Sequence, residues 1–358
     1  MILFITRKFP PTTGGMERVA YDLHKHLSTV ADVRLVKWGG SNKWLPLILP
    51  WFLLSSLPVL SSGKATLIYL QDGLLAPLGL ILKLLARKPV VTTIHGLDIT
   101  YGNRFYQSVV PRCAKRLDKV ICVSDATKEA CLRRGIQAEK IAVIPNGISD
   151  DFYTKEGRQQ LRAGLSQKLQ IDLNGKRILL SVGRLVERKG IHWFVENVMP
   201  ILTEKDKAYV YLIAGEGAFA PKIRDAIEAA SLKDCVFMLG GVDDDMLKCL
   251  YNASDIFIMP NVPVEGDMEG FGLVALEASS CALPVVASNV DGIKDAVKSK
   301  ENGFLVEPYD TQGFVEIIEW LLANARRRGE FGTRAREFTL ENYGWEKVAK
   351  LYLEQFVA

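Results

Sequence analysis

Short apolar runs alternate with amphipathic stretches along the whole chain, and these runs form two series of predicted strands. The first series comprises residues 2–6, 33–37, 66–70, 90–94, 119–123 and 141–144. The second series comprises residues 177–182, 209–214, 235–239, 255–259, 284–287 and 304–306. Strands that are apolar at every position, rather than at alternate positions, are typical of parallel sheets that helices cover on both faces.

Helical patterns fill most of the gaps between these predicted strands. They cover residues 16–29, 125–134, 191–204, 219–231, 243–252, 270–281 and 311–326. A chain of 358 residues is long enough for two domains, and two such series favour an α/β fold with two doubly wound domains. A single β/α barrel is the structural alternative. It does not explain the polar stretch 154–176, which is typical of a linker with a short helix.

The charge is distributed unequally between the two halves of the chain. Residues 1–150 carry a net charge of +10 and residues 151–358 a net charge of −6, within a total of +4. A basic half suits an anionic substrate, an anionic membrane surface or nucleic acid, and an ordinary solvated basic face is the alternative. Few aromatic residues lie among the basic residues of 104–140, which disfavours single-stranded nucleic acid as the partner.

The composition excludes several classes of protein. With 48% hydrophobic and 24% charged residues, the chain is neither disordered, collagen-like nor a disulfide scaffold. We expect no secretory leader, because Arg7 and Lys8 follow the first apolar run instead of preceding it. The six cysteines form no C-x-x-C pair, and His24 and His26 point to different faces of a predicted helix. We therefore expect reduced thiols, a cytoplasmic location and no metal site.

Residues 44–63 carry no charge and are apolar enough to raise the question of a membrane span. Their length is borderline for a spanning helix, and three prolines interrupt them. A span would also place two predicted strands of one sheet on opposite sides of a membrane. Two interpretations stay open: a buried helix or loop, and a monotopic surface whose aromatic residues lie in the lipid interface. Residues 74–88, apolar and then basic, add weight to the second.

In the first half, three loops that follow predicted strands carry candidate binding residues: the loop of Gly14 and Gly15, the loop of His95, and the loop Pro145-Asn146-Gly147 after strand 141–144. Gly14 and Gly15 open the first helix, where glycine lets a phosphate or sugar approach the backbone amides. Their spacing is not G-x-G-x-x-G, which disfavours a dinucleotide site. His95 follows the strand 90–94, and its imidazole can donate to a sugar hydroxyl. Taken singly, each of these loops is equally well explained as a structural turn, and His95 as a structural histidine.

In the second half, the loop after strand 177–182 contains two cations, Arg184 and Lys189. They can converge on a diphosphate and offset the charge of a leaving group without a metal ion. The alternative is a basic surface loop. Glu216 lies in a second glycine-rich loop, Gly215-Glu216-Gly217, which follows strand 209–214.

Glu269 and Glu277 form the strongest signal in the sequence. If residues 270–278 form a helix, Glu269 stands at its N-terminus and Glu277 two turns further on, on nearly the same side. The glycines of the segment expose amides beside Glu269 that can bind sugar hydroxyls and a phosphate. Glu277 can then accept both hydroxyls of a ribose. An amphipathic helix with a capping glutamate is the alternative.

Together and in this order, these residues resemble the retaining glycosyltransferases of family 4, which have the GT-B fold. The glutamate pair with the segment Glu269–Gly272 is the most specific part, and it becomes strong in combination with Arg184 and Lys189. The resemblance implies two Rossmann-like domains that face each other across a cleft. It implies an acceptor-binding domain over 1–165, a donor-binding domain over 166–344, and a last helix, 345–358, that crosses back to the first domain.

The resemblance also implies roles for individual residues. The implied catalytic residues are Glu269, His95, Arg184 and Lys189. The implied donor-binding residues are Gly14, Gly15, Gly183, Arg184, Lys189, Glu216, Gly240, Val242, Glu269, Gly270, Phe271, Gly272, Leu273 and Glu277. The implied acceptor-side residues are Gly15, Asp98 and Asn146.

The activity that the resemblance implies is transfer of a hexose from a nucleotide-diphosphate sugar, of the UDP or GDP type, with retention of configuration. No metal and no further cofactor is expected. The basic first half and residues 44–63 favour a lipid-linked or cell-envelope glycan as acceptor, hence polysaccharide biosynthesis at the inner face of a membrane. A GT-B binding or scaffold protein without transferase activity, a nucleotide-sugar epimerase and a phosphorylase stay open as alternatives.

Overall fold

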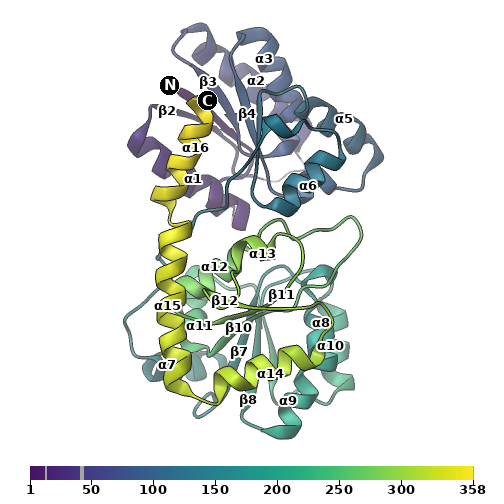
Figure 1. Cartoon of the computed structure of the whole chain (residues 1–358), viewed down its shortest axis with the longest axis vertical. Helices are drawn as coiled ribbons and strands as arrows, with labels where there is room; N and C mark the ends of the chain where they lie inside the picture. Colours follow the sequence, from purple (N-terminus) through teal and green to yellow (C-terminus); the bar gives the residue numbers. More distant parts are fainter. Residues whose placement is uncertain (13, 41–43, 358) are drawn as a thin grey trace. The chain divides into compact units, whose positions relative to one another are not determined.

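The computed structural model describes residues 1–12, 14–40 and 44–357, and it contains two six-stranded sheets flanked by helices (Figure 1). Every strand pairing within both sheets is parallel. The chain divides into two compact units. The first comprises residues 1–147, 266–271 and those from 343 onwards, and the second comprises residues 148–265 and 272–342.

The sheet of the first unit has the strand order β2-β1-β3-β4-β5-β6. Its strands are β1 (Ile2–Thr6), β2 (Val33–Lys37), β3 (Leu67–Leu70), β4 (Val90–Ile94), β5 (Lys119–Cys122) and β6 (Ile141–Val143). All residues of β1, β3 and β4 are buried, which explains why these segments are apolar throughout. The strand order reverses between β1 and β3, and in such sheets ligands bind where the order reverses, beyond the carboxyl ends of the strands.

Seven α-helices and two 3₁₀ turns surround this sheet in the described part of the chain. They are α1 (Gly15–Val30), α2 (Leu45–Ser61), η2 (Gly73–Leu75), α3 (Ala76–Ala86), α4 (Leu97–Thr100), α5 (Arg104–Ala114), α6 (Asp125–Arg133), η3 (Ala138–Lys140) and α16 (Trp345–Val357). The C-terminal helix α16 contacts α1. Its Tyr352 ring packs edge-to-face against Tyr69 of β3, and Lys119 Nζ donates to Gln355 Oε1 at 3.0 Å.

The sheet of the second unit has the order β12-β11-β10-β7-β8-β9, which is the Rossmann order. Its strands are β7 (Arg177–Val182), β8 (Tyr209–Ala214), β9 (Val236–Gly240), β10 (Ile256–Met259), β11 (Val285–Ser288) and β12 (Gly303–Val306). Alternate residues of β7 face the two hydrophobic cores on opposite sides of the sheet. Leu179 lies in one core, and Ile178 and Leu180 lie in the other. The order reverses between β7 and β10.

The remaining helices cover this second sheet. They are α7 (Arg158–Leu169), η4 (Glu187–Lys189), α8 (Ile191–Asn197), α9 (Met199–Lys205), α10 (Ala220–Ala229), α11 (Asp244–Ala253), α12 (Leu273–Ser280), α13 (Ile293–Ala296), α14 (Thr311–Leu322) and α15 (Ala325–Tyr343). The predicted helix 191–204 is two helices, because the chain bends at Val198 ahead of Pro200. The predicted helix 311–326 ends at Leu322.

The N-terminal stretch of the first unit ends at Gly147, whereas the predicted first domain extends to residue 165. Residues 148–165 belong to the second unit because Phe152, Leu161 and Leu165 form part of its core. Asp255 also ties α7 to this unit: its Oδ2 accepts from Arg162 Nη2.

The apolar segment 44–63 is mostly helical, and Pro50 and Pro58 lie inside α2 without ending it. The helix buries Ile48 and Phe52 in the core of the first unit. Leu49, Leu53, Val59 and Leu60 are partly buried against the same core, whereas Leu47, Trp51, Leu54 and Leu57 are exposed. No helix in the described ranges is long and apolar enough to cross a membrane.

Candidate functional site

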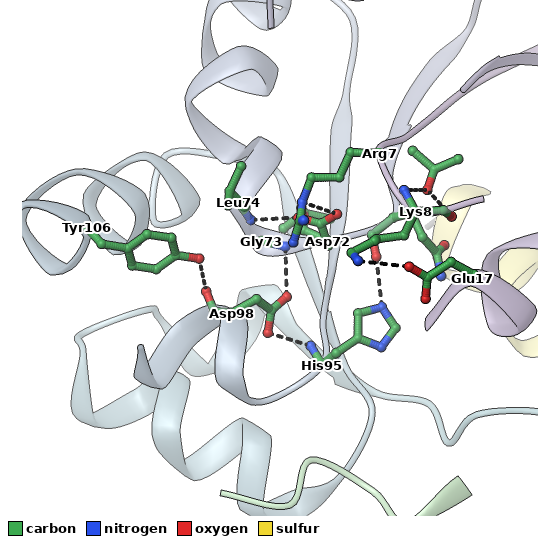
Figure 2. A network of polar contacts seen from close by, with 12 residues as sticks. Arg7, Lys8, Glu17, Asp72, Gly73, Leu74, His95, Asp98 and Tyr106 are labelled. Atoms are coloured by element: carbon green, nitrogen blue, oxygen red, sulfur yellow. Dashed lines mark hydrogen bonds and ion pairs between the residues drawn. The ribbon is translucent and has the colours of Figure 1, made fainter. Parts of the chain in front are cut away.

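A network of polar side chains lies beyond the carboxyl ends of β1, β3 and β4, where the order of the first sheet reverses (Figure 2). Arg7 Nε donates to Asp72 at 3.1 Å, and Asp72 Oδ1 also accepts from Leu74 N at 3.0 Å. Asp72 is fully buried and Arg7 nearly so. Burial disfavours the charge on Arg7, but the Asp72 and Asp98 carboxylates raise the pKa of the guanidinium overall.

His95 Nε2 lies 2.8 Å from Gln71 O (Figure 2). A carbonyl oxygen only accepts, so this contact assigns the ring proton to Nε2, and Nδ1 of the neutral imidazole is an acceptor. The predicted donation from His95 to a sugar hydroxyl thus needs the protonated ring, or else the hydroxyl donates to Nδ1.

Asp98 is buried, and both its carboxylate oxygens accept backbone amides. Oδ1 accepts from His95 N at 2.8 Å and Oδ2 from Gly73 N at 2.9 Å. Burial raises the pKa of this carboxyl group, against the opposing effects of His95 and the amides. Tyr106 Oη donates to Asp98 O at 2.6 Å. Burial, together with the nearby carboxylates, raises the pKa of the Tyr106 hydroxyl. Through these two amides Asp98 holds the loops after β3 and β4 together, and its acceptor-side role stays a prediction.

Gly14 caps α1 with φ 153°, and Gly15 is its first residue. The Glu17 carboxylate lies against Gly14, where a Cβ would come within 2.6 Å of Oε2. Lys8 Nζ pairs with Glu17 Oε1 at 2.8 Å. The Glu17 carboxylate therefore occupies the space beside Gly14, one of the two glycines that we expect to let a phosphate or sugar approach.

In the second unit, the predicted cations follow β7, at the point where the Rossmann order reverses. Arg184 is exposed, and Lys189 ends η4 with its Cε 3.5 Å from the position of a Cβ on Gly183. The side chain of Lys189 thus returns to the carboxyl end of β7. Gly190 has φ 63°, and a Cβ there would overlap Pro260 O beyond β10. The loops after β7 and β10 can pack this closely only with glycine at that position.

Backbone hydrogen bonds join the loops that follow β7, β8 and β9. Gly183 N donates to Ala214 O at 3.0 Å, Leu185 N to Glu216 O at 2.8 Å, and Gly215 N to Gly240 O at 2.7 Å. The exposed Glu216 carboxylate accepts from Gly241 N at 3.3 Å, and Val242 is half-buried in the same loop. The structure therefore brings four predicted donor-binding residues to one edge of the sheet: Gly183, Glu216, Gly240 and Val242.

The prediction that Glu269 begins a helix is wrong, because α12 starts at Leu273. Gly272 precedes the helix with φ 93°, a left-handed conformation that does not belong to a right-handed α-helix, so α12 begins only after this residue. Residues 266–271 instead belong to the first unit. A Cβ on Gly270 would overlap His95 O, and the buried Phe271 ring packs against Tyr343.

Glu277 lies in α12 and is buried. Tyr251 Oη, on α11, donates to Glu277 Oε2 at 2.8 Å. The structure therefore holds this carboxylate through a residue that sequence reasoning missed. Tyr251 belongs to an ordinary amphipathic helix pattern, and nothing in its spacing pairs it with Glu277.

Asn146 is nearly buried in the loop after β6, and its Oδ1 has no hydrogen-bond partner within the described ranges. The adjacent Gly147 packs against the Trp345 indole. Arg7 and Asp72 were also missed as site residues. Asp72 follows the predicted strand 66–70, and this position at a strand end is the signal that points to it. Among the described residues, no group of three or more His, Cys, Asp or Glu side chains can hold a metal ion.

Comparison with known proteins bears on both units. The sequence model of the family described as "Glycosyltransferase Family 4" matches residues 29–152, and that described as "Glycosyl transferases group 1" matches residues 166–338. The chain is a GT-B glycosyltransferase of the family 4 type. The predicted fold of two Rossmann-like domains is thereby confirmed.

Relatives and solved structures match over most of the chain. An uncharacterized glycosyltransferase of Methanocaldococcus jannaschii is 28% identical over 302 residues, 82% of this chain and 75% of its own. A GDP-mannose-dependent phosphatidylinositol monomannoside mannosyltransferase of Mycolicibacterium smegmatis is 24% identical, with 96% of this chain and 95% of its own covered. The Anabaena HepE structure in complex with UDP-glucose superimposes with a TM-score of 0.80 at 21% identity, covering 100% and 99% of the two chains.

Proposed function

We propose that this glycosyltransferase moves a hexose from a UDP or GDP sugar to a lipid-linked or cell-envelope glycan, with retention of configuration and without a metal ion. We place this reaction on the cytoplasmic side of a membrane, in polysaccharide biosynthesis. The observation that carries the proposal is the edge of the second sheet. There Lys189 returns to Gly183 at the end of β7, beside the joined loops of β8 and β9.

The chemistry of this edge suits a nucleoside diphosphate. Arg184 and Lys189 supply two positive charges where the sheet order reverses, and cations there stabilise the diphosphate as the glycosidic bond breaks. The carboxylates of Glu216 and Glu277 are acceptors for a base and a ribose. Two named relatives leave the base open, since one is GDP-mannose-dependent and the Anabaena protein was solved with UDP-glucose.

The acceptor proposal rests on charge and on one relative. Residues 1–150 carry a net charge of +10, which suits a phosphate-containing acceptor. The mycobacterial relative is named for a phosphatidylinositol mannoside, a lipid acceptor. A binding protein of the same fold without activity is the competing candidate, and it predicts nucleotide binding without transfer.

Thermal unfolding against UDP, GDP, ADP and CMP, each with and without a chelator, tests the donor site. A nucleotide at one hundred times its dissociation constant stabilises the folded state by about 2.7 kcal/mol. We expect one diphosphate to raise the melting temperature with or without chelator, and Lys189→Gln to abolish the effect. Lys155→Gln, an exposed lysine of the same unit, is the matched control.

The matching nucleotide sugar is then supplied with extracted lipid-linked glycans, and the anomeric configuration of the product is read by NMR. Retention of configuration supports the proposal and inversion contradicts it. If no nucleoside diphosphate stabilises the protein, the donor site is not at this edge. Stabilisation without transfer to any acceptor favours the inactive binding protein.

A further inference from the structure

We propose that the outer faces of α2 and α3 form a docking surface for an anionic lipid bilayer. This inference names a partner for the proposed transferase. It rests on the proposed function only for the biological role of the surface, because vesicle binding is measured without donor or acceptor.

The outer face of α2 is apolar from Leu47 to Pro58. Leu47, Trp51, Leu54 and Pro58 are exposed and recur every three or four residues, so they lie along one stripe of the helix. Leu47 and Leu54 are each 64% exposed. A surface helix of a globular protein normally presents polar residues on this side, and contiguous apolar surface marks an interaction site.

Helix α3 extends the same surface. It packs beside α2 (Figure 1), and both helices bury their inner faces in one core cluster, which includes Phe52 and Leu82. On its outer side, Ile81, Leu84 and Leu85 are exposed, with Leu84 at 72%. The two helices together present more exposed leucine and tryptophan than scattered surface residues explain.

The charges around these helices indicate which partner covers them. Residues 33–97 contain seven lysines and arginines and a single acidic residue, Asp72; one of the seven, Lys83, pairs with Asp118 at 2.7 Å. Asp72 is buried and paired with Arg7, so it does not offset the positive charge at the surface. Lys64 and Arg87 are exposed just beyond the C-terminal ends of α2 and α3. An apolar face with a basic border suits an anionic membrane, where tryptophan prefers the interface.

The direction of α2 connects this surface to the polar network. Because α2 links two parallel strands, β2 and β3, its N-terminal end lies at the carboxyl edge of the sheet. His95 and Asp72 lie at this same edge. A lipid-linked acceptor held in the membrane at α2 therefore has a short route to the loops of the first unit.

Sedimentation with vesicles tests the proposal. We expect the protein to bind vesicles of phosphatidylglycerol and phosphatidylcholine in equal parts, and to bind pure phosphatidylcholine far less. Binding should weaken as the salt concentration approaches about 1 M, where charges are screened beyond about 3 Å. Leu47→Gln with Leu54→Gln should weaken vesicle binding by about tenfold or more, and Lys64→Gln should weaken it mainly at low salt.

Leu132→Gln is the matched control, because it makes the same change on an exposed leucine of α6 in the same unit. It should leave vesicle binding unchanged. The proposal is overturned if the protein ignores anionic vesicles at low salt, or if Leu132→Gln weakens binding as much as the α2 variants do. Self-association that the α2 variants abolish, without vesicle binding, would identify a second copy of the chain as the partner. Nucleotide stabilisation of each variant, measured in parallel, keeps this outcome separate from that of the donor site.

Discussion

Replacing Tyr251 by phenylalanine tests how the buried Glu277 carboxylate is held. The change removes the hydroxyl that donates to Glu277 Oε2 at 2.8 Å and leaves the ring in place. The ring packs against Phe152 and Phe257, contacts that phenylalanine preserves. The substitution thus isolates one hydrogen bond to a carboxylate.

The size of the effect follows from the burial of both partners. Tyr251 is fully buried and Glu277 is 4% exposed, so water replaces the lost donor poorly. A hydrogen bond to a charged group contributes about 1.5–3 kcal/mol. For a unit of this size, the melting temperature should fall by about 3–12 °C. We also expect weaker nucleotide binding, by up to about tenfold, if the loosened carboxylate no longer meets the ribose.

The assay compares the affinity for a nucleoside diphosphate with that for its 2′-deoxy form in wild type and in Tyr251→Phe. If Glu277 binds the ribose, the preference for the ribose form should shrink in the variant. Tyr211→Phe is the matched control, since it removes a buried hydrogen bond to Ser181 within the same unit. Equal losses for both nucleotides, or an unchanged melting temperature, would refute the reasoning.

Three further outcomes are expected. Asp255→Ala should lower the free energy of unfolding in urea by about 3–5 kcal/mol, because it removes a buried carboxylate and leaves the half-buried Arg328 guanidinium without its 3.0 Å partner. Gly270→Ala should cost about 1–3 kcal/mol and reduce transfer, because its Cβ would overlap His95 O, and calorimetry with a transfer assay checks both. Burial and the charge of Lys37 lower the pKa of His24 below its usual 6.5. As the pH drops, the unfolded chain therefore takes up this proton before the folded chain does, and the free energy of unfolding should fall below pH 6.5. Urea midpoints measured against pH should show this decrease, and they should show a smaller one in His24→Gln.

The positions of the strands could be predicted almost to the residue, because parallel strands that are buried on both faces are recognisable from their own sequence. Each is a short apolar run between polar turns, and β1, β7 and β8 match their predicted bounds. Helix ends were less predictable, since they depend on single backbone conformations. The left-handed Gly272 moved the start of α12 past Glu269, and no periodicity in the sequence signals that.

The two candidate sites differ in how far local sequence describes them. At the edge of the second sheet, glycines and cations follow their strands directly, so residues close in sequence are also close in space. In the first unit, Arg7 and Asp72 are 65 positions apart, and only the pairing of β1 with β3 brings them together. Spacing along the chain cannot reveal such a pair.

The same distinction explains why the acceptor is harder to assign than the donor. A nucleoside diphosphate is bound largely through backbone amides and a few fixed charges, and glycine spacing records these constraints. An acceptor is bound through side chains and surfaces that the fold brings together from distant parts of the chain. The stripe of Leu47, Trp51 and Leu54 on α2, which we propose to dock on a membrane, is such a surface. The sequence left both a buried helix and a monotopic surface open for residues 44–63, because the exposure of the stripe depends on which side of α2 packs on the core of the first unit.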